Sequence, residues 1–212
     1  MKRWCTVSAA SPLLRLTPSI VFRIWRSPCF SARFAGALFE DSEEVACALG
    51  SRAYLLLDAF FAVGPVFKRS AQHPDLLHVL TRAKKNVVAY RTPRIRKKRS
   101  RGRPRQYGTK LKLVPLFDSW RHKFETANTE IYKQREQVRY LTLNLIWKPV
   151  KRHIRFILAE SSRGRIILMT SDLSLGPLVA IELYSRRVTI ETLFDRVKNI
   201  LGGMGYHFWS KS

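Results

Sequence analysis

The stretch from Tyr184 to Lys198 limits most strongly what this chain can fold into, because a helix would separate its side chains by polarity. A helix turns about 100° per residue, so Tyr184, Arg187, Glu191 and Lys198 fall within an arc of about 60°. The other side collects apolar residues: Ile190, Leu193, Phe194, Val197, Ile200 and Leu201. We predict a helix whose apolar face packs on a core. Its polar face fits either a solvated surface or a functional site.

The order of these four polar residues resembles the signature of bacterial insertion-sequence transposases of the DDE type. That signature is Tyr, two residues, Arg, three residues, Glu, six residues, Lys, and all four positions match. Val188 stands where the family often has Trp. The resemblance implies that Glu191 is the last of three metal-binding carboxylates. It also implies that Tyr184, Arg187 and Lys198 bind DNA near the cut.

A second segment that carries the resemblance surrounds Asp58. The apolar run Ala53 to Leu57 predicts a buried strand, and Asp58 follows it. A single Asp after a strand is usually a turn or capping residue. The phrase DAFFA, followed by GPVF, is however similar to the family's segment around its second catalytic Asp. The resemblance therefore implies that Asp58 and Glu191 are catalytic and hold Mg²⁺.

The expected chemistry is DNA cleavage followed by strand transfer. Two Mg²⁺ ions activate the attacking oxygen and stabilise the leaving oxygen in such reactions, and they prefer carboxylate ligands. The resemblance implies hydrolysis at the transposon end, and then attack of the freed 3′-hydroxyl on target DNA. Expected partners are transposon-end and target DNA, with dimerisation on DNA as a further expectation.

The charge of the chain points to a polyanionic partner. Thirty-nine Lys and Arg against 15 Asp and Glu give +24, which makes nucleic acid the first choice and a membrane surface the lesser one. No run of eighteen apolar residues occurs, so no membrane-spanning helix is predicted. The three cysteines are far apart and form no Cys-x-x-Cys pair, which indicates free thiols in a reducing compartment. We expect a bacterial cytoplasmic, nucleoid-associated protein.

Basic residues are densest between Arg94 and Arg105, where eight of twelve are Lys or Arg. Such a run predicts a solvated loop that contacts phosphates without reading sequence. The phrase RGRPR with the following YG also recurs in the transposase family. We assign Arg101, Arg103 and Arg105 to DNA binding.

Further elements follow from local patterns. Strands are predicted at Leu77 to Leu80, Val138 to Trp147, Val150 to Leu158 and Arg165 to Thr170, with a turn at Gly164. Short helices are predicted from Asp41 to Gly50, after Pro65 and after Pro177, and residues 118–136 are predicted to be helical or loose. Asp172 is interpreted as the lead-in to the last helix rather than as a catalytic residue.

The resemblance implies an α/β fold, with a ribonuclease-H-like core and a basic β-rich insertion before the last catalytic helix. The predicted divisions are an atypical basic segment at 1–39, a first core segment at 40–81, the insertion at 82–164, a second core segment at 165–205 and a tail at 206–212. The family's first catalytic Asp lies in an Asp-Gly phrase, and none precedes Asp58. We therefore expect the C-terminal portion of a transposase, with an incomplete metal site and little cleavage by this chain alone.

Two alternatives stay open. The acid-free composition of residues 1–39 and the high charge also fit a non-catalytic nucleic-acid-binding protein, such as an organellar ribosomal protein. A truncated transposase that represses by occupying transposon ends is compatible with the family resemblance.

Overall fold

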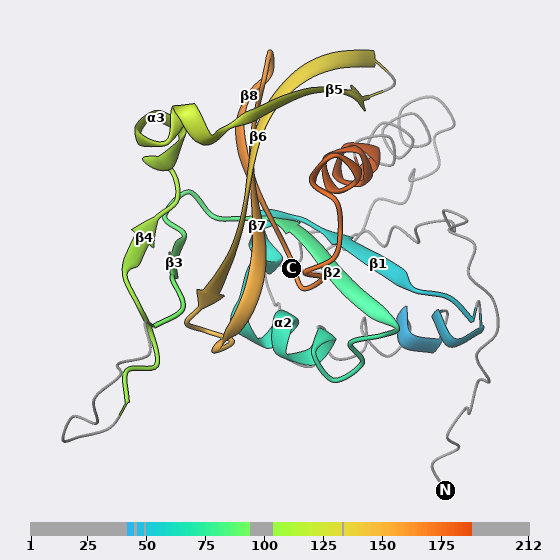
Figure 1. The fold of residues 1–212 in the computed structure, drawn as a ribbon. Helices are drawn as coiled ribbons and strands as arrows, with labels where there is room; N and C mark the ends of the chain where they lie inside the picture. The colour runs from blue at the N-terminus through green and yellow to red at the C-terminus, as the bar shows by residue number, and fades with distance from the viewer. Residues whose placement is uncertain (1–41, 45, 49, 94–103, 133, 188–212) are drawn as a thin grey trace, which may run out of the picture.

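The computed structural model describes residues 42–44, 46–48, 50–93, 104–132 and 134–187. It is a mixed α/β structure built on one eight-stranded sheet, with the strands in the order β1-β2-β8-β7-β6-β3-β4 and with β5 paired to β6 (Figure 1). The strands are β1 (Ala53–Leu57), β2 (Leu77–Arg82), β3 (Val88–Tyr90), β4 (Lys110–Lys112), β5 (Glu125–Ile131), β6 (Gln134–Trp147), β7 (Arg152–Ser161) and β8 (Gly164–Thr170).

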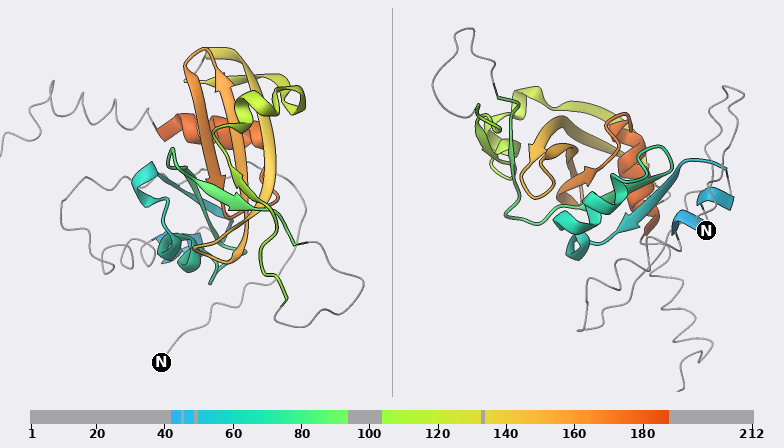
Figure 2. Two further views of the ribbon diagram at one scale, coloured as in Figure 1. Left: turned by 90° about the vertical axis from the view of Figure 1, so that its left-hand side faces the viewer. Right: turned by 90° about the horizontal axis from the view of Figure 1, so that it is seen from below.

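The sheet has a short parallel end and a long antiparallel portion. β1 and β2 are parallel, with Leu57 opposite Thr81, and all other pairs are antiparallel. Parallel neighbours need a crossover, and here it contains the 3-10 helix η1 (Ala59–Phe61) and helix α2 (Gly64–Ser70). Figure 2 shows β6, β7 and β8 rising as a curved antiparallel layer well beyond β1 and β2.

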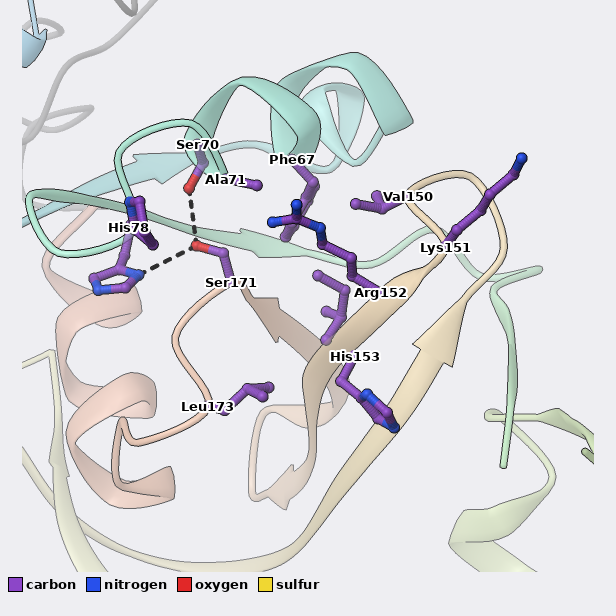
Figure 3. Close-up of a pocket in the computed structure, with 12 residues that line it drawn as sticks. Phe67, Ser70, Ala71, His78, Val150, Lys151, Arg152, His153, Ser171 and Leu173 are labelled. Atoms are coloured by element: carbon purple, nitrogen blue, oxygen red, sulfur yellow. Dashed lines mark hydrogen bonds between the residues drawn. The ribbon is translucent and has the colours of Figure 1, made fainter. Parts of the chain in front are cut away.

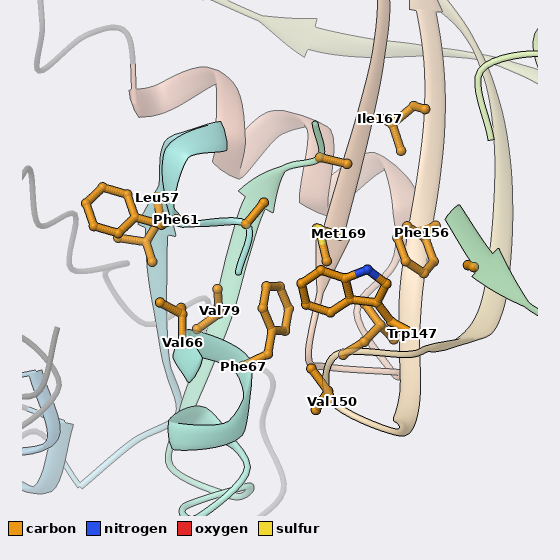
Figure 4. Packing of buried hydrophobic residues seen from close by; sticks show 14 of the residues in the cluster. Leu57, Phe61, Val66, Phe67, Val79, Trp147, Val150, Phe156, Ile167 and Met169 are labelled. Atoms are coloured by element: carbon orange, nitrogen blue, oxygen red, sulfur yellow. The ribbon is translucent and has the colours of Figure 1, made fainter. Parts of the chain in front are cut away.

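Each face of the sheet carries its own apolar core. Alternation along β1 sends Leu55 and Leu57 to the side of α2 and Leu56 to the other side. On the first side, Phe67 of α2 packs edge-on against Trp147 with ring centroids 5.3 Å apart (Figure 4). This contact anchors the crossover helix to the long strand β6.

The opposite face is covered by a helix that begins at residue 177 and is described to 187 (Figure 1). Ala180, Ile181 and Leu183 of this helix join Leu56 and Leu168 of the sheet in the second core. The predicted helix start at Pro177 is confirmed. Pro is favoured at this position because the first turn needs no amide hydrogen there.

Most predicted strands are confirmed, some with shifted ends. β1 has the predicted bounds, β2 extends to Arg82, β6 begins at Gln134, β7 spans Arg152–Ser161 and β8 begins at the turn residue Gly164. Gly164 has φ +112°, a conformation that side chains disfavour. Residues 42–44 and 46–48 are helical and Gly50 follows with φ +59°, which agrees with the short helix predicted there.

The prediction that residues 118–136 are helical or loose is wrong for much of its length. After helix α3 (Leu116–Ser119) and the 3-10 helix η2 (Arg121–Lys123), the chain forms β5 and turns into β6. The seven residues of β5 pair with the first half of β6, from Glu125 opposite Tyr140 to Ile131 opposite Gln134. Only Ile131 of β5 is buried. The strand therefore lacks the apolar alternation from which a strand can be predicted. Cross-strand pairing stabilises it instead.

The ribonuclease-H-like fold stays a prediction, and so do the predicted domain boundaries. The sheet runs without interruption from β2 into β8, which joins the parallel end to the antiparallel strands. Within the described chain, β1 pairs with β2 alone and forms one edge of the sheet.

Candidate functional site

Asp58 lies at the carboxyl end of β1, where the parallel portion of the sheet ends. Its Oδ1 accepts a hydrogen bond of 2.7 Å from the Ala59 amide, which makes Asp58 the N-cap of η1. The Thr81 hydroxyl donates to the Asp58 carbonyl over 2.8 Å and fixes the backbone to β2. The Asp58 side chain is nevertheless 48% exposed. A fixed backbone and an exposed carboxylate suit a residue that contacts a ligand.

Arg187 reaches this carboxylate from the opposite end of the described sequence. Its Nη2 lies 3.8 Å from Asp58 Oδ1, at the outer limit of an ion pair. The helix at 177–187 is held on the sheet by Ala180 and Ile181, which brings its last described turn beside the end of β1. Two residues that the sequence assigned to one site therefore lie together.

Tyr184 stands one helical turn before Arg187 and supports it. The Arg187 guanidinium lies over the Tyr184 ring, 5.6 Å from the ring centroid. The ring packs against the second core, and its burial raises the pKa of the Tyr184 hydroxyl. Tyr184 therefore stays protonated at neutral pH and offers Arg187 an uncharged aromatic face.

Glu191 and Lys198 lie outside the described residues, so their position relative to Asp58 stays a prediction. Among the residues that the structure describes, no group of three His, Cys, Asp or Glu side chains could hold a metal ion. Asp58 thus supplies one half-exposed carboxylate towards the predicted Mg²⁺ site.

Asp172 follows β8 as Asp58 follows β1, but its surroundings differ. Its Oδ2 accepts a 2.6 Å hydrogen bond from Tyr54, and its Oδ1 accepts two from the amide and hydroxyl of Ser174. Burial by itself raises the pKa of the Asp172 carboxyl, but the hydrogen bonds from Ser174 and Tyr54 outweigh it and hold that pKa at about 2. Burial and the bond to Asp172 raise the pKa of Tyr54 to about 12. Asp172 is a structural anion that ties β1 to the segment before residue 177.

The predicted DNA-binding arginines fall in and beside an undescribed segment. Arg101 and Arg103 lie outside the described residues, and Arg105 is exposed in the connection between β3 and β4. The β3–β4 ribbon exposes Lys110 and Lys112 on one face, two residues apart. Its position at the end of the sheet is clear in Figure 1.

Sequence reasoning missed Trp120, which lies between two cations near this ribbon. The Arg91 guanidinium lies 5.2 Å and the Lys123 ammonium 4.4 Å from its ring centroid. Cations stacked on an aromatic ring form a surface that can contact phosphates and bases. The basic neighbours of Trp120 in the sequence hint at this surface, but Arg91, just after β3, reaches it only through the fold.

Within the described residues, no helix is long and apolar enough to cross a membrane. Comparison with known proteins identifies no match, either among protein-family models or among curated proteins.

Proposed function

We propose that this chain belongs to a DDE-type transposase that binds and processes transposon ends. The observation that carries the proposal is the meeting of Asp58 with Arg187 and Tyr184 at one end of the sheet. These residues come from two segments far apart in the sequence, each singled out by its own motif. Their proximity supports a shared site.

Asp58, Glu191 and Mg²⁺ have distinct roles in the proposed reaction. Asp58 and Glu191 would hold Mg²⁺, which when bound lowers the pKa of the attacking water and stabilises the leaving oxygen. Arg187 would hold a phosphate beside Asp58 by two parallel hydrogen bonds. Tyr184 keeps the guanidinium in place, and Lys198 adds a point charge.

The proposed bond changes are two displacements at phosphorus. In the first, water forms a bond to the phosphorus at the transposon end, the bond to the 3′-oxygen breaks, and that oxygen takes a proton. In the second, the freed 3′-hydroxyl loses its proton, attacks a target phosphodiester and displaces another 3′-oxygen. Neither step needs an oxidant or a reductant.

A ribonuclease-H-like core belongs to the proposal. The parallel pair β1–β2, its crossover helix α2 and a helix on the opposite face are consistent with half of such a core. The antiparallel strands β3 to β8 are consistent with an insertion that carries the basic ribbon.

Binding of a DNA duplex by neighbouring arginine variants tests the site. We expect Arg187→Gln to weaken binding about tenfold, because it removes a charge-assisted phosphate contact. Arg186→Gln is the matched control, since Arg186 pairs with Glu182 on the exposed side of the same helix. Equal affinities of both variants and the parent would contradict a phosphate role for Arg187.

Cleavage of plasmid DNA with Mg²⁺ tests the catalytic role. Because the sequence before Asp58 offers no Asp-Gly segment, we expect DNA binding with little or no cleavage. Robust Mg²⁺-dependent cleavage that Glu191→Gln abolishes would refute the expectation of little cleavage and establish an active nuclease.

The second candidate is a non-catalytic nucleic-acid-binding protein, for example an organellar ribosomal protein. The cation-flanked Trp120 and the charge of +24 favour it. Competition between duplex DNA and structured RNA separates the two candidates. Preference for RNA, unaffected by Arg187→Gln, would favour the second.

A further inference from the structure

A pocket of about 410 Å³ lies on the α2 side of the molecule, away from Asp58 (Figure 3). It is bounded by the end of α2, the turn between β6 and β7 with the start of β7, and the segment after β8. Its lining comprises Phe67, Ser70, Ala71, Pro74, His78, Val150, Lys151, Arg152, His153, Ile154, Ser171 and Leu173.

This pocket and the Asp58 site occupy opposite ends of the parallel strands. Asp58 follows Leu57, which is paired with Thr81, whereas the pocket contacts His78, which is paired with Tyr54. Three residue positions along a strand correspond to about 10 Å. The pocket is therefore separate from the proposed catalytic site, and its role does not depend on that proposal.

The wall of the pocket is mainly apolar. Phe67, Ala71 and Val150 form its side towards α2 and the β6–β7 turn, while Leu173 borders it from the segment after β8 (Figure 3). An apolar concave wall with few polar groups is the usual surface of a small-molecule site.

The charged side chains that line the pocket are cationic. Lys151 and Arg152 are exposed at its rim, and no Asp or Glu is among the described residues that line it. Figure 3 shows the Arg152 side chain turned towards the α2 side of the pocket, while Lys151 extends outwards. Lys151 has φ +58°, a left-handed backbone that a lysine adopts at some cost. Burial lowers the pKa of His78, so His78 is neutral at pH 7 and adds no charge.

The carbonyl end of α2 does not offset these cations with free acceptors. The carbonyls of Phe67, Arg69 and Ser70 accept hydrogen bonds from Ala71, Gln72 and His73 respectively. The C-terminal end of a helix carries a partial negative charge, so Lys151 and Arg152, and not α2, supply the attraction for an anion.

Two serine hydroxyls give the pocket a polar corner. Ser70 donates its proton to the Leu77 carbonyl over 3.0 Å, so the 3.0 Å contact between Ser70 and Ser171 uses the Ser171 proton. The Ser171 oxygen also accepts from the Val79 amide and lies 3.5 Å from His78 Nδ1. The Ser171 proton can therefore turn from Ser70 to a ligand without leaving a buried donor unpaired.

We propose that this pocket binds one nucleotide, with its base and sugar against the apolar wall and its phosphate at Arg152. A nucleotide combines a flat, weakly polar body with a doubly charged group, which matches the wall and the rim. A guanidinium can hold a phosphate through two parallel hydrogen bonds. The nucleotide is either free or the end of a nucleic-acid strand, because both present the same base, sugar and phosphate.

Calorimetric titration of the full chain with AMP, adenosine and a short 5′-phosphorylated single strand tests the proposal. We expect AMP or the strand to bind, and we expect Arg152→Gln to weaken that binding at least about tenfold. Ala71→Leu, which places a larger side chain in the wall of the pocket, should also weaken that binding. The matched control is Arg135→Gln, an exposed arginine on β6 that does not line the pocket.

The ligands distinguish the two sources. Arg152-dependent binding of AMP but not of the strand identifies a free nucleotide, and the reverse identifies a strand end. Adenosine binding as tightly as AMP would overturn the phosphate contact at Arg152. The proposal fails if neither AMP nor the strand binds at millimolar concentration, or if Arg135→Gln weakens binding as much as Arg152→Gln.

Discussion

Two aspartates that follow strands show how surroundings decide the role of a residue. Asp58 is half exposed and meets Arg187 at 3.8 Å, whereas the Asp172 side chain is 5% exposed and accepts bonds from Tyr54 and Ser174. The first is open to a ligand and the second is occupied by its own chain. This difference agrees with the assignment of Asp58 to the site and of Asp172 to the approach to the last helix.

Asp172→Asn should destabilise the fold at neutral pH. The pKa of Asp172 is about 2 in the folded chain against an ordinary 3.8, so its carboxylate favours folding above pH 3.8. That contribution is lost as the pH falls through 3.8 towards 2, because the unfolded chain takes up the proton first. We expect a loss of about 2 kcal/mol in the free energy of unfolding at pH 7, shrinking towards pH 2.

Urea unfolding at pH 7 and near pH 3 measures this effect. Asp75→Asn is the control, because Asp75 is exposed. The same pH dependence in the parent and in Asp172→Asn would show that the Tyr54–Asp172 bond does not stabilise the fold.

At the scale of elements, helix α2 and the β3–β4 ribbon depend on different forces. Helix α2 has seven residues and is held by its buried face, since so short a helix has little stability of its own. The ribbon has three residues on each side and depends on close backbone contact. At its loop end, the Gly108 amide donates to the Arg91 carbonyl over 2.8 Å.

Phe67→Ala should remove about 3 to 5 kcal/mol from the free energy of unfolding, because Phe67 is fully buried and its ring packs on Trp147. Phe60→Ala deletes the same atoms from a side chain that is 60% exposed, and we expect it to cost less than about 1 kcal/mol. Thermal or urea unfolding of both variants gives the comparison. Similar losses would mean that α2 is not anchored through the Trp147 contact.

Gly108→Ala should loosen the ribbon. A Cβ at this position would lie 2.7 Å from the Arg91 carbonyl oxygen and 2.8 Å from that of Thr92, so the backbone must move. We expect faster hydrogen exchange at the Arg91 and Gly108 amides, with little change at β7. Lys110→Ala, which shortens an exposed side chain of the same ribbon, should leave these rates unchanged. Unchanged exchange in Gly108→Ala would show that the ribbon tolerates wider spacing of the two segments at its loop end.

At the scale of the whole molecule, one sheet joins the Asp58 end to the basic ribbon. Acidic residues are few, and several of them pair with arginines on β6 to β8, as Glu160 does with Arg139 and Arg165. Other described cations, such as Lys110 and Lys112, are exposed on the ribbon at the other end of the sheet. If the chain binds DNA as proposed, this uneven distribution favours contact of the DNA with the ribbon.

The salt dependence of DNA affinity should separate the arginines between β3 and β4 from the arginines that pair with carboxylates. Replacing Arg101, Arg103 and Arg105 with Gln should lower the slope of log K against log salt by about 2 to 3, since each phosphate contact contributes about 0.9. Replacing Arg139, Arg163 and Arg165 removes the same charge, but these side chains already pair with carboxylates. Fluorescence anisotropy over a range of salt gives both slopes. Equal slopes would mean that only overall charge matters.

Local sequence patterns were sufficient to predict those elements that have an apolar face. We could predict the strand at Ala53–Leu57, the alternation in β6, the turn at Gly164 and the helix start at Pro177. Burial and backbone conformation directly restrict which residue types can occupy these positions. Local patterns failed for β5, which has one buried residue and is defined by its partner. The position of Glu191 stays a prediction.

The sequence by itself determined the charge, the main strands and the motif residues, since these depend on composition and on neighbours along the chain. Only the tertiary structure decided that Arg187 meets Asp58, that Trp120 meets Arg91, and that Arg152 borders a pocket with Ser70 and Ser171. The physical reason is that side-chain contacts between distant segments depend on strand register and helix docking. Both are set by packing of the two cores as a whole.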